Sequence, residues 1–191
     1  MVLDAKFALG EKFSASRFFD ECRKHDAVEF NTLGAMISIL LKQPPRSDDK
    51  DHPVRVVVDA GCQPGAWEQF RRRFGVRIVE WFGMVDAPGI LLNDEDKPGA
   101  MGKPVAGVEF RVVDEEDNPL PPGQPGELAF RHPKGRLTYY HKLPEKTEES
   151  YAGGWFHSGD LAVTDEDGFF YYKGRKKESI AAGERTSQPG R

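Results

Sequence analysis

The stretch VRVVVDAGCQPGAWEQFRRRFGVRIVE, residues 54–80, decides the fold of this 191-residue chain. A β-branched run over Val54–Val58 ends at a turn that contains Gly61. A helix is predicted over Pro64–Phe74, and a second short strand over Val76–Glu80. Strand, glycine-containing turn, helix and strand is the βαβ order, which indicates a parallel sheet with ligands at the carboxyl ends of its strands.

Upstream of this stretch we expect two helices, because residues 14–42 contain no proline and one glycine. Ser14 is a candidate N-cap for the first helix, since its hydroxyl can accept from exposed backbone N–H groups. The second helix is expected over Thr32–Leu41, where apolar residues recur with the helical period. Residues 43–53, with three prolines and five charges, predict a surface linker. The basic run Arg71–Arg73 is expected to be a solvated helix face.

The second half of the chain has a different pattern, in which glycine and proline recur every few residues and helical periodicity nearly vanishes. Strands are expected at Val108–Val113 and Gly126–Arg131. Leu161–Val163 and Phe169–Tyr172 flank an Asp-Glu-Asp-Gly turn, which predicts a hairpin. This half is therefore predicted to be a small β-barrel-like subdomain or a sandwich. We expect an α/β subdomain over residues 1–96, a β-rich subdomain over 97–175 and a tail over 176–191.

Composition excludes several classes of protein. The chain has 27 Lys+Arg and 31 Asp+Glu, a balance that argues against nucleic acid as a partner and against a polybasic membrane anchor. No apolar run approaches the roughly 20 residues of a membrane span, and the N-terminus does not resemble a signal peptide. Two distant cysteines predict no disulfide framework. These features predict a cytoplasmic protein with no nucleic-acid partner and no membrane span.

A second stretch, GGWFHSGDL over residues 153–161, is the strongest local signal for chemistry. Two glycines and two aromatic residues precede Gly-Asp, which predicts a bent loop that presents the Asp160 carboxylate. Such a carboxylate can accept from neighbouring hydroxyls of a sugar, as acidic residues do for ribose. The alternative is a plain turn in which Asp160 caps local backbone groups. One of Arg175, Lys176 and Lys177 can contact phosphate or ribose, and the alternative is that the three form an ordinary solvated charge run.

A third stretch, FGMVD, follows the second strand of the βαβ unit, where ligands usually bind. Phe82 followed by Gly83 can stack on a flat ring, and Asp86 can hold a metal or a phosphate-bound cation. The alternative is a core aromatic residue and a surface acid. Gly61 lets a ligand approach the backbone closely. The sequence contains neither a G-x-S-x-G elbow nor a G-x-x-x-x-G-K-[ST] loop, so acyl-hydrolase and P-loop chemistry have no support.

Taken in order, these segments resemble the adenylate-forming enzymes, which comprise acyl-CoA synthetases, luciferases and peptide-synthetase adenylation domains. The carnitine- or fatty-acyl-CoA ligase branch is the most similar. GWFHSGDLAVTDEDGFFYYKGRKKESI (154–180) resembles the family's G-W-F-x-T-G-D-L block. FGMVDA (82–87) resembles its Y-G-x-T-E block, and VVVDAGCQPGAWEQFRRRFGV (56–76) the strand and helix before it. GKPVAGVEFRVVDEEDNPLPPGQPGELAFR (102–131) is similar to the β-barrel segment. The implied fold is the parallel βαβ portion of an adenylate-forming N-terminal domain, followed by the β-rich subdomain.

The resemblance implies a nucleotide site. Asp160 would accept the ribose hydroxyls of ATP or of the acyl-adenylate, and Arg175 would contact ribose and phosphate. Phe82 would stack on adenine beside Gly83. Asp86 would help to hold Mg²⁺ and the phosphates, which makes it the implied catalytic and metal-binding residue.

The same resemblance implies that Ala60, Gly61 and Cys62 form the opposite wall of the adenine slot. Phe30 and Asn31 would lie near the acyl pocket. The implied reaction has two steps. A carboxylic acid attacks the α-phosphorus of ATP to give acyl-adenylate and pyrophosphate, and the CoA thiolate then displaces AMP. ATP, Mg²⁺ and CoA are thus the implied cofactors.

The chain also departs from the family pattern. The family's phosphate loop and its C-terminal lid with a catalytic lysine are missing, which implies an internal fragment that is catalytically incomplete alone. Val85 replaces a threonine, Asp86 is shorter than glutamate, and Gly174 stands where many relatives have aspartate. A non-catalytic remnant or an interaction module on the same scaffold is therefore the alternative. A sheet without its neighbouring strands favours self-association or a complementary chain.

Overall fold

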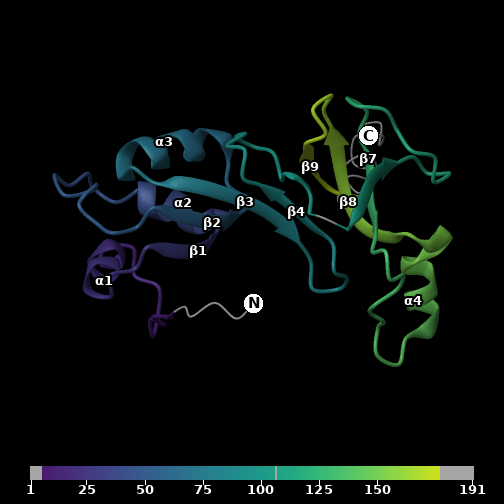
Figure 1. Ribbon diagram of the computed structural model, residues 1–191, viewed down its shortest axis with the longest axis horizontal. Coiled ribbons are helices and arrows are strands. Elements are labelled where there is room, and N and C mark those ends of the chain that lie inside the picture. The colour runs from purple at the N-terminus through teal and green to yellow at the C-terminus, as the bar shows by residue number, and fades with distance from the viewer. Residues whose placement is uncertain (1–5, 106, 177–191) are drawn as a thin grey trace, which may run out of the picture. The chain divides into compact units, whose positions relative to one another are not determined.

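The computed structural model describes residues 6–105 and 107–176 (Figure 1). Contacts divide the chain into two compact units. The first contains the residues up to Glu80 together with Asp94–Gly99, and the second contains Trp81–Asn93 and the residues from Ala100 onward. The subdomain limits at residues 97 and 176 stay predictions, and residues 177–191 of the predicted tail lie outside the described residues.

A parallel sheet forms the centre of the first unit. Strands β1 (Glu29–Leu33), β2 (Val56–Ala60) and β3 (Arg77–Gly83) follow one another in space as they do in sequence. Helix α2 (Gly34–Leu41) lies between β1 and β2 in the chain, and α3 (Pro64–Phe74) between β2 and β3. The two helices pack against each other. The predicted βαβ order is confirmed, and it occurs twice.

Helix α3 has the limits that the sequence predicts. Pro64 occupies the first turn, where its missing N–H costs nothing. Gly75 ends the helix with a φ of 72°, a left-handed conformation that glycine adopts without strain. Trp67 and Phe70 are fully buried, as predicted. They join a core with members from both helices and the sheet, including Ile37, Leu40, Val57 and Ile78.

Both upstream helices begin later than predicted. Helix α1 (Phe18–Lys24) starts after Arg17 and no side chain caps it, so the prediction of Ser14 as the N-cap was wrong. The hydroxyl of Ser14 instead lies 3.5 Å from that of Ser16. The second helix was predicted from Thr32, but Thr32 and Leu33 belong to β1.

Gly34 accounts for the start of α2. A Cβ atom at this position would overlap the carbonyl group of Gly61, so the chain turns from strand to helix where it passes close to the β2–α3 turn. Leu33 remains 64% exposed, although the sequence places it on the apolar helix face. The helical period alone did not reveal the strand, because pairing with β2 overrides local preference.

The second unit is rich in antiparallel strands. Its main sheet has the order β6-β7-β8-β9, and Figure 1 shows β8 between β7 and β9. These strands are β6 (Glu109–Val113), β7 (Gly126–Arg131), β8 (Phe156–Thr164) and β9 (Phe170–Arg175). The remaining elements are β4 (Ile90–Asn93), β5 (Lys103–Pro104), α4 (Pro144–Ser150) and the short 3₁₀ helix Ala152–Gly154.

Two predictions for this unit have different outcomes. The hairpin between β8 and β9 is confirmed: one carboxylate oxygen of Asp165 accepts the N–H groups of Asp167 at 3.0 Å and Phe169 at 2.9 Å. A closed barrel is absent from the described residues. β6 and β9 are the two ends of an open sheet, with apolar side chains of all four strands in its core.

Candidate functional site

Asp160 and Arg175 form an ion pair between neighbouring strands of the second unit. The two residues are partners in the β8–β9 register, and Nε of Arg175 lies 2.9 Å from Oδ1 of Asp160. Asp160 is 4% exposed. Burial raises the pKa of its carboxyl group, while the charge of Arg175 opposes that rise. The sequence therefore named two residues that the fold brings together.

The surroundings of Asp160 differ from the predicted bent loop. From Phe156 onward the segment is strand β8, so that prediction was wrong for Asp160 itself. Gly159 has a φ of 71°, which bends the strand beside Asp160. The hydroxyl of Ser158 accepts the Asp160 N–H at 3.0 Å and donates to the Leu128 carbonyl at 2.7 Å. The carboxylate is thus held in a kinked strand of the sheet.

Glu127 on β7 stabilises the same bend, and sequence reasoning missed it. Its carboxylate accepts the N–H of Gly159 at 3.0 Å and lies 2.8 Å from Nζ of Lys176. The His157 imidazole, whose Nδ1 lies 3.6 Å from Oε2 of Glu127, and the Lys176 ammonium together lower the pKa of Glu127 to about 2. Its signal in the sequence is an acid among the apolar residues of a strand, GELAFR. Glu127 therefore fixes the residue next to Asp160.

Asp86 lies on an exposed loop after β3. Its Oδ2 accepts a hydrogen bond from the Tyr140 hydroxyl at 2.7 Å, and its carbonyl accepts one from the Thr138 hydroxyl at 2.6 Å. The Thr138 hydroxyl also lies 2.7 Å from that of Tyr151. The neighbouring Val85 side chain is fully exposed. Sequence reasoning named Asp86 but missed Tyr140, because the two are far apart in the chain.

Phe82 and Gly83 are the last two residues of β3. Phe82 is half-buried and packs against the apolar core of the second unit, which includes Leu91 and Met101. A Cβ atom at Gly83 would lie 2.6 Å from the ring of Trp81. The packing of Phe82 matches the alternative of a core aromatic residue, and stacking on adenine stays a prediction.

The predicted wall of the adenine slot lies at the carboxyl end of β2 in the first unit. Ala60 is the last residue of that strand, and Gly61 has a φ of 93°. The backbone N–H groups of Gly61 and Cys62 both donate to the carboxylate of Glu80, with a distance of 3.3 Å from Cys62. Burial raises the pKa of the Cys62 thiol to about 12. Glu80 therefore holds this turn in place, and the sequence did not single it out.

A row of buried polar side chains crosses this end of the sheet. Thr32, Asp59 and Glu80 are partners in the register of β1, β2 and β3. Burial raises the pKa of Asp59 to about 6 and that of Glu80 to about 7. Within the described residues, neither carboxylate oxygen of Asp59 has a hydrogen-bond partner. Burial thus favours the protonated form of both carboxyl groups.

Phe30 and Asn31, the residues predicted near an acyl pocket, lie on β1. The Phe30 ring packs edge-on against Phe18, with 4.7 Å between ring centroids, and is part of the core of the first unit. Asn31 is exposed. Their role in a substrate pocket stays a prediction.

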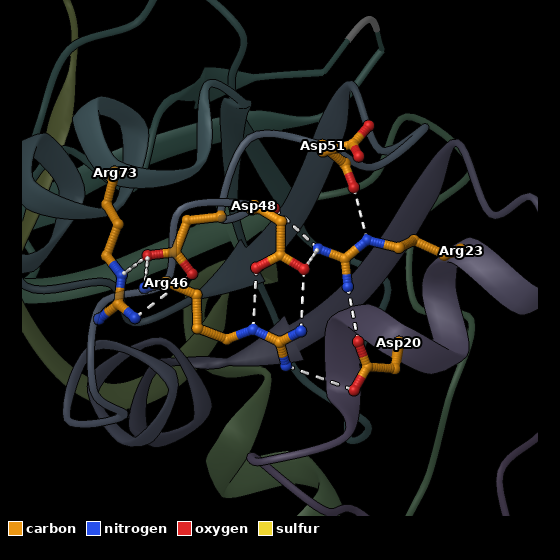
Figure 2. Close-up of polar contacts among 7 residues, drawn as sticks. Asp20, Arg23, Arg46, Asp48, Asp51 and Arg73 are labelled. Carbon is orange, nitrogen blue, oxygen red and sulfur yellow. Dashed lines mark hydrogen bonds and ion pairs between the residues drawn. The ribbon is translucent and has the colours of Figure 1, made fainter.

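A cluster of arginines and aspartates anchors residues 43–53, which are irregular as predicted (Figure 2). Arg73 lies 2.7 Å from Asp49 and donates to the backbone carbonyls of Leu41, Gln43 and Pro44. The expectation that the whole run Arg71–Arg73 faces solvent was therefore wrong for Arg73. That side chain is 16% exposed.

The rest of this cluster joins the linker to α1. Both carboxylate oxygens of Asp48 accept from Arg46 at 2.8 Å, and Arg23 lies 2.6 Å from Asp20. A neighbouring pocket of about 190 Å³ is lined by Asp20, Arg23 and Arg46 and by apolar side chains such as Phe19 and Phe74. Because the guanidinium groups are paired with carboxylates, the cluster is built as a structural clasp, not as an anion site.

Two further findings concern residues 6–105 and 107–176. None of their helices combines the length and apolarity that crossing a bilayer requires. They also contain no group of three or more His, Cys, Asp or Glu side chains around a shared metal position.

Comparison with known proteins decides the family. A family model described as AMP-binding enzyme matches residues 4–140, which is more than half of the chain. The chain belongs to this family of AMP-binding enzymes. It is 36% identical over 169 residues to the medium/long-chain-fatty-acid–CoA ligase FadD17 of Mycobacterium tuberculosis, covering 88% of this chain and 34% of that protein. It is 33% identical to a crotonobetaine/carnitine–CoA ligase of Salmonella arizonae, covering 94% of this chain and 36% of that protein.

Solved structures agree with this assignment. The anthranilate CoA ligase AuaEII in complex with anthranoyl-AMP is 27% identical, with a TM-score of 0.73 over 85% of this chain and 32% of that one. The ATP-bound RpMatB-BxBclM chimera B3 is 26% identical, with a TM-score of 0.77 over 87% and 34%. The chain thus has the adenylate-forming fold that the sequence predicted. It spans about a third of the length of the curated relatives it matches.

Proposed function

We propose that this AMP-binding chain is a nucleotide-binding section of an ATP-dependent acyl-CoA synthetase. The parent enzyme joins a carboxylic acid to CoA through an acyl-adenylate. The single observation that carries the proposal is the ion pair between the buried Asp160 and the half-exposed Arg175, an acceptor for hydroxyl groups beside a cation for phosphate. The names of the relatives, which include two kinds of CoA ligase, support the same reaction class.

In the proposed mechanism a carboxylate oxygen attacks the α-phosphorus of ATP, and the bond to the leaving pyrophosphate breaks. The CoA thiolate then attacks the acyl carbonyl carbon and AMP leaves. Asp160 accepts the ribose hydroxyls, and Arg175 contacts ribose and phosphate. Phe82 stacks on adenine. Such residues act by holding the reacting groups in place and by balancing charge.

In this proposal Ala60, Gly61 and Cys62 form one wall of the adenine slot. The buried carboxylate of Glu80 accepts two backbone N–H groups of that turn, which gives the wall a fixed shape before a nucleotide arrives. A preformed wall lowers the entropy cost of binding.

Mg²⁺ accompanies ATP in this reaction and neutralises phosphate charge. It commonly binds proteins through one or two carboxylates together with substrate phosphates. The exposed carboxylate of Asp86 fits that donor set, and we assign Asp86 to hold Mg²⁺. In this role Asp86 would supply a carboxylate oxygen as a ligand for the cation.

The remaining parts of the proposal concern this chain when it is separated from the rest of the parent enzyme. We expect negligible turnover without the rest of the enzyme, weak binding of adenine nucleotides, and a cytoplasmic location. Because unpaired strand edges favour association, we expect self-association or a complementary chain. A clean monomer in analytical ultracentrifugation would contradict that expectation.

The test is a calorimetric titration of the purified chain with Mg-ATP and with a non-hydrolysable acyl-adenylate analogue. Asp160→Ala should abolish binding of both. Asp167→Ala, an exposed aspartate in the β8–β9 turn, is the matched control and should bind like the unchanged chain. Absence of binding to a folded chain would refute a preformed nucleotide site.

One observation favours a second candidate, a non-catalytic remnant or interaction module on this scaffold. Val85 is fully exposed and has no hydroxyl to offer a phosphate, and the adjacent Asp86 is shorter than glutamate. If the first proposal is right, the double change Val85→Thr and Asp86→Glu in a complete parent enzyme should raise adenylation. No gain in adenylation would favour the remnant.

A further inference from the structure

Tyr140 is the side chain that holds the Asp86 carboxylate. Its hydroxyl donates to Oδ2 of Asp86 at 2.7 Å, and the nearby Thr138 hydroxyl donates to the Asp86 carbonyl at 2.6 Å. Two positions of one segment, on either side of Tyr139, therefore fix both the backbone and the side chain of Asp86. A lone aspartate on an exposed loop would otherwise populate several rotamers.

Tyr140 is itself well anchored. Its backbone N–H donates to the hydroxyl of Thr147 at 3.0 Å, and Thr147 is 4% exposed. The Lys146 ammonium lies 4.1 Å from the centroid of the Tyr140 ring. Both partners belong to α4, so a helix, not a free loop, sets the position of the phenol.

The direction of this hydrogen bond matters for a cation. A phenol that donates to one oxygen of a carboxylate leaves the other oxygen available and fixes its direction. Groups that support a metal ligand in this way commonly change metal affinity by about 10- to 100-fold when they are removed. Asp86 is also one methylene shorter than the glutamate of related enzymes, so its orientation has less freedom to adjust.

We propose that Tyr140 is a positioning residue, which orients the Asp86 carboxylate toward the Mg²⁺ of a bound nucleotide. The inference rests on the proposed function, because it gives Asp86 the role assigned there. Tyr140 itself touches neither the cation nor the nucleotide.

The experiment compares Tyr140→Phe with Tyr139→Phe in the full chain. The neighbouring Tyr139 is 77% exposed, and each variant removes one hydroxyl and nothing else. Calorimetry measures binding of ATP with Mg²⁺, of ATP with EDTA, and of AMP. Tyr140→Phe should weaken binding of Mg-ATP about tenfold and leave ATP with EDTA and AMP unchanged. Tyr139→Phe should change none of the three.

Equal Mg-ATP binding by the two variants, or tighter binding by Tyr140→Phe, overturns the inference while leaving the proposed function intact. A loss that is the same with and without Mg²⁺ shows a general structural role and overturns it too. If the unchanged chain binds neither nucleotide, the proposed function of the isolated chain fails. In that case the test uses Mn²⁺ without nucleotide and measures, by NMR, how strongly the ion broadens the Asp86 amide signal. The broadening should be weaker in Tyr140→Phe than in the unchanged chain. Equal broadening in the two proteins, or no broadening in the unchanged chain, overturns the inference.

Discussion

Replacing Arg73 with alanine should cause the largest loss of stability of any single arginine change in α3. The variant leaves the Asp49 carboxylate, which is 13% exposed, without its ion-pair partner. It also removes the donor for the backbone carbonyls of Leu41, Gln43 and Pro44. Breaking a buried pair by removing one partner typically costs about 3–5 kcal/mol. Because this pair retains some contact with water, we expect a loss of about 3 kcal/mol.

Urea unfolding followed by circular dichroism measures this loss as a change in the free energy of unfolding. The matched control is Arg72→Ala, one position earlier on the exposed side of the same helix, which should change stability by less than about 0.5 kcal/mol. Arg73→Lys keeps the charge but loses the planar fork that serves several acceptors, so its loss should be intermediate. Equal losses for Arg73→Ala and Arg72→Ala would refute the reasoning.

The same pair predicts a pH dependence. Burial raises the pKa of Asp49, but the hydrogen bond and charge of Arg73, together with the hydrogen bond from the Arg46 backbone N–H, outweigh burial and hold that pKa below its ordinary value. A depressed acid pKa contributes stability above the unfolded-state pKa, and this contribution is lost as pH falls through the folded-state value. The difference in stability between the unchanged chain and Arg73→Ala should therefore shrink at acid pH. A difference that stays constant with pH would contradict the assignment.

Three further outcomes are expected. Burial raises the pKa of Glu80 to about 7, so the free energy of unfolding should fall as pH rises from about 4.5 to 7. Glu80→Gln should flatten this pH dependence in urea unfolding, and an unchanged pH dependence would contradict the prediction. Cys62 is buried, and burial raises the pKa of its thiol to about 12, so iodoacetamide should label it only after unfolding. Rapid labelling of Cys62 in the native chain would contradict this prediction. Gly34→Ala should destabilise the chain by at least about 2 kcal/mol, because the new methyl group would overlap the carbonyl of Gly61. The control Gly65→Ala has open space around the new methyl group and should be neutral or slightly stabilising. Equal melting temperatures of the two variants would show that the backbone at Gly34 shifts to make room.

Much of the fold could be predicted where local signals and tertiary packing agree. Helix α3 has the predicted limits because Pro64, two inward aromatic residues and Gly75 all point to the same helix. Strand β7 and the Asp165 hairpin turn are likewise local features. Strand β1 could not be read in this way, since its side chains alternate only weakly and its pairing partner lies 27 residues away in the register of Glu29 and Val56.

The residues of the candidate site were likewise predicted where the signal is local and missed where it depends on distant parts of the chain. Asp160 and Arg175 were named from short motifs, and register on adjacent strands brings them together. Glu127 and Tyr140 were missed because each acts on a residue far away in the chain, at Gly159 and Asp86. Hydrogen bonds of that kind depend on how strands and loops are placed, which periodicity does not report. The roles of the named residues in binding remain predictions.

The interleaving of the two units has a consequence for synthesis on the ribosome. The chain leaves the first unit after Glu80 and returns to it at Asp94–Gly99. There Asp96 accepts a hydrogen bond from the Trp67 indole at 3.2 Å and forms an ion pair with Arg71 at 2.8 Å. At about 5–20 residues per second, translation from residue 80 to 99 takes roughly one to four seconds. During that interval β1 and β2 have already been synthesised and β3 is completed at Gly83, but these clamps on α3 are still missing. A pause introduced between codons 80 and 94 should therefore prolong a state in which the emerging chain is open to chaperones.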